Sequence, residues 1–148
     1  MPLGVEKATL IGSGLVPIDD YTISYISVAA GGGGGAGANA GGGGGAGGFR
    51  NSYASEDTGA GCATETVLTL EGYEVYTITV GGGGAMGSYQ NPGALGGVSS
   101  IAGGSLSTIT STGGGGGGSG WGNTNGNPTV GGSGGGGWTI DGGPVTGG

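Results

Sequence analysis

The sequence predicts a mostly irregular, all-β chain without an ordinary side-chain core, and three observations lead to this prediction. Glycine accounts for 48 of the 148 residues. Leu, Ile, Val and Phe together stay under about 20% of the chain, a level below which globular domains are uncommon. Short segments rich in β-branched residues lie directly beside runs of glycine. The chain is therefore expected to order its backbone by some means other than burial of large side chains.

The glycines occur in unbroken runs rather than scattered through the chain. Glycine has no side chain to bury, and it loses more backbone freedom on ordering than any other residue. The runs therefore either stay disordered or have their backbone amides paired in a regular way. They cover residues 31–35, 41–45, 81–84, 113–118 and 134–137.

Three kinds of glycine-rich structure can be weighed against these runs. Collagen needs glycine at every third position and abundant proline, whereas this chain has continuous runs and only 5 prolines. A flexible linker would leave the runs disordered. A bundle of three-fold glycine helices, the counterpart of polyproline II with a rise of about 3.1 Å per residue, would pair its amides between neighbouring helices. The residues by themselves allow either the linker or the bundle.

The segments between the runs favour the ordered alternative. Residues 22–28, 73–80 and 105–112 alternate polar and apolar side chains, and residues 138–140 form a shorter example. Such alternation of β-branched residues is typical of strands with one buried face. Linkers do not normally carry a strand beside each glycine run. We therefore expect short strands at the ends of the glycine segments.

Composition argues against several classes of function. The chain has nine acidic and two basic residues, a formal charge of -7 and no histidine, which argues against nucleic-acid binding. The lone Cys62 permits no internal disulfide and is expected to be a small buried residue. Without histidine, sites for transition metals and His-dependent catalysis lack ligands. No apolar run approaches a membrane span. We expect a protein that is not an enzyme and binds no cofactor or metal.

The order of the motifs resembles a known family. A strand ending Val28-Ala-Ala is followed by GGGGGAGANAGGGGGAGGFR at 31–50, YTITVGGGGA at 76–85 and STITSTGGGGGGSGWG at 107–122. Over residues 22–137 this order resembles the glycine-rich domain of bacteriophage tail-fibre, adhesin and related virion proteins. The resemblance implies a bundle of polyglycine-II helices edged by short β-strands, with connecting loops that contact a host receptor.

The chain divides into two expected parts, an N-terminal attachment arm at 1–21 and the glycine-rich domain at 22–148. The arm lies outside the resemblance, carries few charges and is predicted to be extended. An exposed apolar segment of this kind favours a partner surface, here another virion protein, although a strand packed on its own domain is the alternative. The candidate attachment residues are Leu3, Val5, Leu10, Ile11, Leu15, Val16 and Ile18.

Three connecting segments, 51–58, 89–92 and 121–128, have a composition suited to recognition. Aromatic side chains flanked by Asn, Ser and Thr offer flat faces with adaptable hydrogen-bonding groups, as in paratopes, and they also suit sugar rings. Alternatively, Trp121 and Trp138 cover the ends of the glycine lattice. The candidate receptor contacts are Tyr53, Glu56, Asp57, Tyr89, Asn91, Trp121, Asn123 and Asn125.

The charged residues of the domain are expected to have ordinary roles. Glu56, Asp57 and Glu65 match the spacing of no standard cation-binding loop, so they are expected to lie in a solvated loop. Arg50 is expected either to pair with one of the excess acids or to contact a ligand carboxylate. The aromatic-Arg pair that ends the family block favours the structural role.

These observations lead to a functional expectation with one rival. The chain is expected to be a structural protein on the external surface of a phage virion, as a tail-fibre tip, an adhesin or a decorating fibre. Its expected partners are other virion proteins and a host-surface glycan or protein, and a homo-oligomer such as a trimer fits this role. The rival is a secreted self-assembling filament or surface-layer protein, in which the arm enters the sheet of the next copy.

Overall fold

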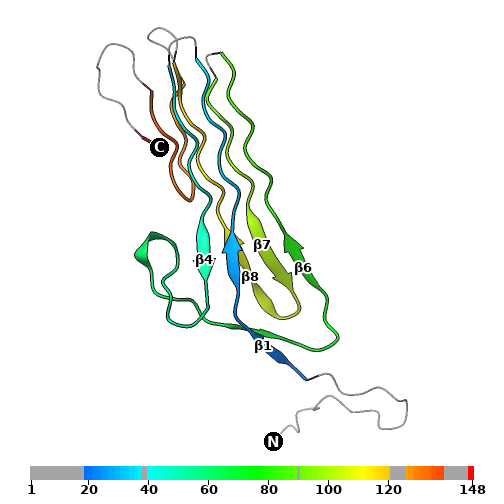
Figure 1. Cartoon of the computed structure of the whole chain (residues 1–148). Helices are drawn as coiled ribbons and strands as arrows, with labels where there is room; N and C mark the ends of the chain where they lie inside the picture. Colours follow the sequence, from blue (N-terminus) through cyan, green and yellow to red (C-terminus); the bar gives the residue numbers. More distant parts are fainter. Residues whose placement is uncertain (1–18, 38–39, 90, 121–125, 139–146) are drawn as a thin grey trace, which may run out of the picture.

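The computed structural model describes residues 19–37, 40–89, 91–120, 126–138 and 147–148. It shows an elongated molecule in which a layer of short strands at one end continues into a bundle of extended glycine-rich segments (Figure 1). The expected attachment residues, all between 1 and 18, lie outside the described residues, as do Trp121, Asn123 and Asn125. No described helix is long and apolar enough to cross a membrane.

The strands form four small antiparallel sheets. β1 (Tyr21–Ile23) pairs with β5 (Leu68–Leu70), and β2 (Ile26–Val28) pairs with β4 (Phe49–Asn51). A three-stranded sheet has the order β6 (Tyr76–Thr79), β7 (Ser99–Gly103) and β8 (Leu106–Ser111). β3 (Ala40–Gly41) pairs with β9 (Ser119–Gly120), and one turn of 3-10 helix, η1, covers Gly59–Gly61.

The expected strands are present, but two of them differ in extent. The segment 22–28 is divided between β1 and β2, because Tyr25 turns into the interior and its N–H donates to Ser52 Oγ at 2.8 Å. The expected strand at 73–80 begins only at Tyr76, since Tyr73 has a φ of 61° that no strand accommodates. The strand expected at 105–112 is confirmed as β8. Of the segment 138–140, only Trp138 is described, and it is not in a strand.

We call β1, β2 and β4 to β8, with their connecting loops, the strand layer (Figure 1). Each of these strands except β1 and β5 is continuous with an extended glycine-rich segment. We call these segments together the glycine bundle. β2 leads into 29–37, β6 into 80–88 and β8 into 112–120, while 41–48 leads into β4 and 92–98 into β7 (Figure 1). Residues 126–132 and 133–138 complete the bundle. The expected bundle edged by short strands is therefore confirmed.

Hydrogen bonds within the bundle repeat every third residue. The N–H groups of Gly32 and Gly35 donate to the segment 41–48, whereas that of Gly33 between them donates to the segment 92–98. Successive residues thus form hydrogen bonds with different neighbouring segments, and residues three positions apart bond to the same segment. This is the behaviour of a chain with three residues per turn and no internal hydrogen bonds. The segments are polyglycine-II helices.

The segment 112–120, which we call the central segment, is surrounded by other segments. Every carbonyl from 112 to 118 accepts a hydrogen bond, and every N–H from 114 to 119 donates one. Its partners lie in 29–37, 41–48 and 92–98 as well as in the last two segments of the bundle. Residues 113–120 are all buried. Backbone groups removed from water are costly unless paired, and here these carbonyl and N–H groups are paired with neighbouring segments.

Glycine is required inside the bundle because the backbones approach closely. A Cβ atom added to Gly32 or Gly116 would lie less than 3.0 Å from backbone atoms of another segment, closer than real Cβ atoms come. At Gly43, Gly82 and Gly83, by contrast, an added Cβ would meet nothing within 4 Å. The side-chain core is correspondingly small: the buried hydrophobic residues in the described part are Tyr25, Ala29 and Leu68.

Candidate functional site

The residues expected to contact a receptor fall into groups at opposite ends of the molecule. Tyr53, Glu56 and Asp57 are exposed in the loop that follows β4, within the strand layer. Tyr89 and Asn91 are exposed where the segments 80–88 and 92–98 connect, at the far end of the bundle (Figure 1). The expected contacts therefore form no single surface.

The far end also carries the ends of the third expected recognition segment. Gly120 and Gly126 flank residues 121–125, and the Ser119 N–H donates to the Gly126 carbonyl at 2.8 Å. Gly120 also lies beside Gly37, the last described residue of its segment. We call this end, with the connections at 88–92 and 120–126, the tip. Two of the three segments expected to bind a receptor thus start and finish at the same end.

A buried asparagine organises the loop after β4. Asn51 is fully buried. Its Oδ1 accepts from the Tyr53 N–H at 2.8 Å, and its Nδ2 donates to the carboxylate of Glu56 at 3.3 Å. The Asn51 N–H donates to Thr58 Oγ1 at 3.2 Å. The loop is thus anchored from within. Sequence reasoning missed this residue, because an Asn beside several polar residues resembles an ordinary loop residue.

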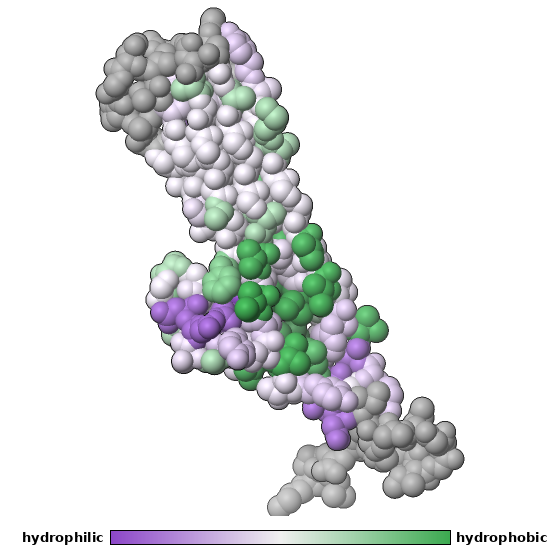
Figure 2. Space-filling model, viewed as in Figure 1, coloured by the Kyte–Doolittle hydropathy of each residue, from purple (hydrophilic) through white to green (hydrophobic). Residues whose placement is uncertain are grey.

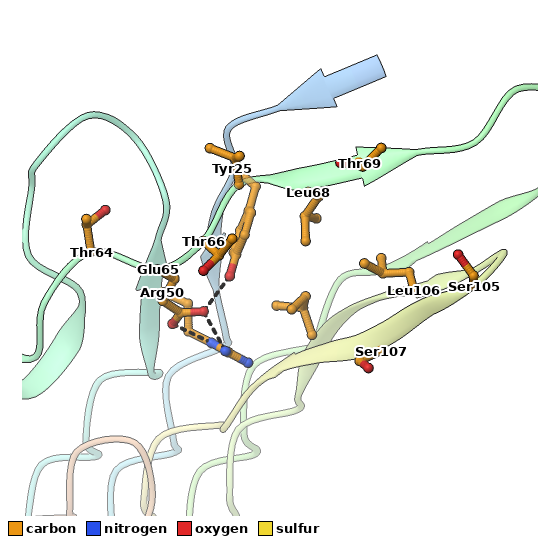
Figure 3. A pocket seen from close by; sticks show the side chains of 12 residues that line it. Tyr25, Arg50, Thr64, Glu65, Thr66, Leu68, Thr69, Ser105, Leu106 and Ser107 are labelled. Carbon is orange, nitrogen blue, oxygen red and sulfur yellow. Dashed lines mark hydrogen bonds and ion pairs between the residues drawn. The ribbon is translucent and has the colours of Figure 1, made fainter. Parts of the chain in front are cut away.

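Arg50, Glu65 and Tyr25 form the charged cluster of the strand layer (Figure 3). Arg50 Nε donates to Glu65 Oε1 at 2.7 Å, and Arg50 Nη2 donates to Glu65 Oε2 at 2.5 Å. The Tyr25 hydroxyl donates to the same carboxylate. Arg50 Nη1 also reaches the carbonyl of Thr110 in β8 at 3.3 Å. The expectation that Arg50 pairs with one of the excess acids is confirmed, and the bond to the Thr110 carbonyl links β4 to β8.

The cluster changes the acidity of its members. Hydrogen bonds from Arg50, more than those from Tyr25, lower the pKa of the Glu65 carboxyl below its usual range. Burial and the hydrogen bond to Glu65 raise the pKa of the Tyr25 hydroxyl to about 12. The same carboxylate raises the pKa of the Arg50 guanidinium. Each shift favours the state in which Arg50 and Glu65 are charged and Tyr25 is neutral.

An open groove of about 630 Å³ lies next to this cluster. One wall comes from the segment 64–69, which includes the first two residues of β5, and the other from residues 105–109, which include most of β8 (Figure 3). Leu68, Leu106 and Ile109 supply apolar surface, and Thr and Ser hydroxyls supply polar surface. Because Arg50 already has its carboxylate, the groove offers aliphatic and hydroxyl contacts rather than an unpaired charge.

The acidic residues do not gather around a common point. Glu65 is held by Arg50, whereas Glu56 and Asp57 are exposed in the loop after β4. Within the described ranges, no three His, Cys, Asp or Glu side chains lie close enough to hold a metal ion. Cys62 is exposed and unbonded to another cysteine, so its expected burial was wrong. It follows η1 directly, on a loop that projects from the strand layer.

Charge and hydrophobicity are unevenly distributed along the molecule. The sequence from 75 to 140 has no Asp, Glu, Lys or Arg, and the described charged residues all belong to the strand layer and its loops. Apolar surface also gathers over the strands (Figure 2). Among the strand residues, Ile26, Val28 and Ile78 are 60%, 56% and 71% exposed. The glycine bundle therefore presents a neutral surface, in contrast to the acidic and apolar strand layer.

Comparison with known proteins gives a match to a protein family. The family model described as glycine-rich domain matches residues 13–148. No curated protein and no solved structure matches the chain. The family model covers most of the chain, including all the segments of the bundle and the strands that lead into them. The chain therefore belongs to the glycine-rich domain family.

Proposed function

We propose that this chain is a non-enzymatic structural protein on the outer surface of a bacteriophage virion. Its N-terminal arm attaches it to another virion protein, and the tip of the glycine bundle faces a host-surface glycan or protein. The proposal combines the resemblance of the motif order to that of phage tail-fibre and adhesin proteins with the arrangement of the molecule. It assigns the protein to a fibre tip, an adhesin or a decorating fibre.

The central segment is the observation that carries this proposal. Its backbone groups are bonded on all sides by other segments, and residues 113–120 are buried. Such a bundle is a stiff spacer, because bending it would break hydrogen bonds between several segments at once. A stiff spacer with loops at one end suits a protein that holds a recognition surface away from its point of attachment.

The two ends of the bundle suit different tasks. Asp19, the first described residue, lies beside β1 in the strand layer, at the end opposite the tip. Tyr89 and Asn91 lie at the tip, which also holds both ends of the segment containing Trp121, Asn123 and Asn125. An aromatic ring beside amide groups can stack on a sugar ring while the amides bond its hydroxyls. We assign recognition to the tip and attachment to the strand layer.

The attachment half of the proposal is tested by removing residues 1–18, which leaves β1 and its pairing with β5 intact. The shortened chain is expected to fold, as circular dichroism would show, but to be missing from assembled particles. The control replaces the same residues with a Gly/Ser segment of equal length. Normal incorporation of the shortened chain would overturn the attachment role.

The recognition half is tested by the double variant Tyr89→Ala and Trp121→Ala. Particles that carry this variant are expected to assemble normally and to lose adsorption to host cells. The matched control is Tyr53→Ala, an exposed aromatic residue at the opposite end, which should leave adsorption unchanged. If the tip variant adsorbs like the parent, the protein has a coat or spacer role only.

A secreted self-assembling filament is the second candidate, and the exposed apolar strand residues favour it. Ile26, Val28 and Ile78 are each more than half exposed, and surfaces of this kind promote association. Purification of the full chain distinguishes the two candidates. Filaments that form without any other protein would support the rival, whereas discrete particles of constant mass would support the virion protein.

A further inference from the structure

The groove beside the charged cluster contains apolar side chains that the described residues leave partly uncovered. Leu68 and Leu106 lie on its two facing walls (Figure 3), and Ile109 follows on the wall formed by β8. Leu68 is buried, but its neighbour Val67 is 41% exposed. Leu106 and Ile109 are also partly exposed. The two walls therefore approach one another without closing the apolar space between them.

The apolar surface continues from the groove across the three-stranded sheet. Ile109 pairs with Ile101 in β7, and Ile101 pairs with Ile78 in β6. Residues directly opposite one another in antiparallel strands share a face of the sheet. The three isoleucines therefore form one row that starts in the groove, and Ile78 at its end is 71% exposed. Continuous apolar surface of this kind marks a place where another segment packs.

The chain enters the described part of the molecule at one end of this groove. Asp20 Oδ1 accepts a hydrogen bond from the Gly72 N–H at 3.4 Å. Glu71, which precedes Gly72, accepts a hydrogen bond from Ser105 Oγ at 2.7 Å. Ser105 is one of the residues that line the groove. The residues that precede Asp19 therefore begin beside the groove.

The residues directly before Asp19 are apolar and belong to the domain. The family match begins at residue 13, so it includes the segment 13–18, which we call the proximal arm. This segment has no charged residue and contains Leu15, Val16, Pro17 and Ile18. Proline favours an extended conformation for the residue before it, and six extended residues span about 20 Å. The proximal arm is thus long enough to follow the groove wall 64–69, which has the same number of residues.

We propose that the proximal arm of the same chain lies in this groove. An extended segment directs successive side chains to opposite sides, so Val16 and Ile18 contact one wall and Leu15 contacts the other. The segment completes the small side-chain core of the strand layer. The inference does not depend on the proposed function, and it leaves residues 1–12 for attachment to another virion protein.

Two features favour the chain's own arm over a separate partner. The proximal arm is tethered beside the groove, so it binds at a high effective concentration and needs no encounter with another molecule. The cation next to the groove, Arg50, is already paired with Glu65, so the groove presents no free charge that selects a charged partner. An uncharged apolar segment attached at the end of the groove meets both conditions.

Thiol labelling of full-length chain tests whether the proximal arm covers the groove. In chain carrying Cys62→Ser, the variant Leu106→Cys is expected to react slowly with a soluble thiol reagent. Replacing Leu15, Val16 and Ile18 together by Ser should raise this labelling rate at least about tenfold, because the groove then opens to solvent. Rapid labelling of Leu106→Cys in chain with an unchanged arm would overturn the inference.

The matched control replaces Leu3, Val5 and Leu10 together by Ser. It removes as many apolar side chains from residues outside the family match and should leave the labelling rate of Leu106→Cys unchanged. Val130→Cys, which is 75% exposed in the bundle, should react at the same rate with either arm variant, and this shows that the bundle is intact. Equal acceleration at Leu106→Cys by both arm variants would contradict the proposed position of the proximal arm.

Two measurements complete the test. In the unchanged chain, the NMR order parameters of the Leu15, Val16 and Ile18 amides should lie near the value of about 0.85 for rigid backbone, and values below about 0.6 would overturn the inference. The slow labelling of Leu106→Cys should also persist on dilution by about a hundredfold, because binding within one chain does not depend on concentration. Labelling that accelerates on dilution would assign the groove to the arm of another copy instead.

Discussion

The glycine bundle and the strand layer belong to one chain but are held together by different forces. In the bundle, backbone groups bond to backbone groups, and residues 113–120 are buried without a single large side chain. In the strand layer, side chains make the contacts: Tyr25 and Leu68 are buried, and Arg50 pairs with Glu65. The first region depends on the absence of side chains and the second on their chemistry.

This difference determines which substitutions and solution conditions destabilise each region. Hydrogen-bonded backbones leave no space for an added methyl group, so the bundle is sensitive to any enlargement on its inner positions. The strand layer contains ionisable groups with shifted pKa values, so it is sensitive to pH. The bundle, whose sequence from 75 to 137 carries no charge, should respond little to pH or salt. Mutations and solution conditions can therefore separate the two regions.

The largest effect is expected for Gly116→Ala in the central segment. The new Cβ would lie less than 3.0 Å from the carbonyl of Gly93, and only a shift of the backbone could relieve the clash. We expect a loss of about 3 kcal/mol or more in the free energy of unfolding, measured by denaturant titration.

Gly43→Ala is the matched control for this variant. It lies in the same kind of segment, but its added Cβ meets nothing within 4 Å. It should be neutral or should stabilise by up to about 1 kcal/mol, because alanine has less freedom in the unfolded chain. Equal stability of the two alanine variants would mean that the segments are not packed as described.

A smaller effect is expected for Glu65→Gln in the strand layer. The substitution removes the carboxylate that holds Arg50 and Tyr25, and about 1–2 kcal/mol should be lost at neutral pH, given that the Arg50 side chain is 32% exposed. Since the folded-state pKa of Glu65 is lowered, its contribution is present above the unfolded pKa of about 4.3 and is lost as pH falls through the lower folded value.

The measurement is the unfolding free energy of both proteins between pH 3 and pH 7. The difference between parent and variant should be constant at the upper end and should shrink in acid. Glu74→Gln, an exposed acid of the same layer, serves as the control and should change stability by less than about 0.5 kcal/mol. A difference that persists unchanged at pH 3 would contradict the role given to the ion pair.

A loss of about 1 kcal/mol is expected for Tyr25→Phe, which removes one hydrogen bond to Glu65. The folded-state pKa of Tyr25, about 12, lies above the ordinary tyrosine value of 10.0. Its contribution is therefore fully present below pH 10 and is lost as pH rises towards 12. Thermal unfolding in this range should show a decline in the parent that the variant lacks. Parallel declines would assign the alkaline sensitivity to another group.

The smallest effect is expected where the two regions join. Ser111 is 1% exposed, and its hydroxyl donates to Ser27 Oγ at 2.8 Å, linking β8 to β2. Ser111→Ala should cost at most about 1 kcal/mol, since the small residue still fits and Ser27 alone loses a partner. Ser107→Ala, exposed in the same strand, should cost nothing measurable. A larger loss in the exposed variant would contradict the packing of β8 on β2.

The glycine runs made the bundle predictable, because only regular pairing of their amides could order them. The sequence did not reveal the segments 92–98 and 126–132, which occupy equivalent places without a run of glycines. In these segments residues with side chains are interspersed with glycine, and some of the side chains, such as those of Leu95 and Val130, are exposed. A search of the sequence for glycine runs finds only segments in which packing requires glycine at every position. It misses segments whose solvent-facing positions accept other residues.

The candidate sites were predictable to a smaller extent. The pairing of Arg50 could be predicted from charge, because a single Arg in an acidic domain has many carboxylates with which it can form an ion pair. Which acid it meets could not be inferred, since Glu65 reaches it only through the fold of the loop between β4 and β5. The separation of Tyr53 from Tyr89 likewise depends on the direction in which each segment leaves the strand layer. This direction cannot be predicted from the local sequence.

The position of the central segment has a consequence for how the molecule acquires its structure. Its partners come both from residues synthesised long before it and from residues synthesised after it, and the contact between Ser27 and Ser111 already spans 84 positions. Contacts between such distant residues require large loops to close, and the entropic cost of loop closure precedes the stabilisation by the contacts. This slows folding. A nascent chain that ends before residue 112 lacks the central segment, to which the other segments of the bundle bond. We therefore expect the domain to form late and in one cooperative step, after most of it has left the ribosome.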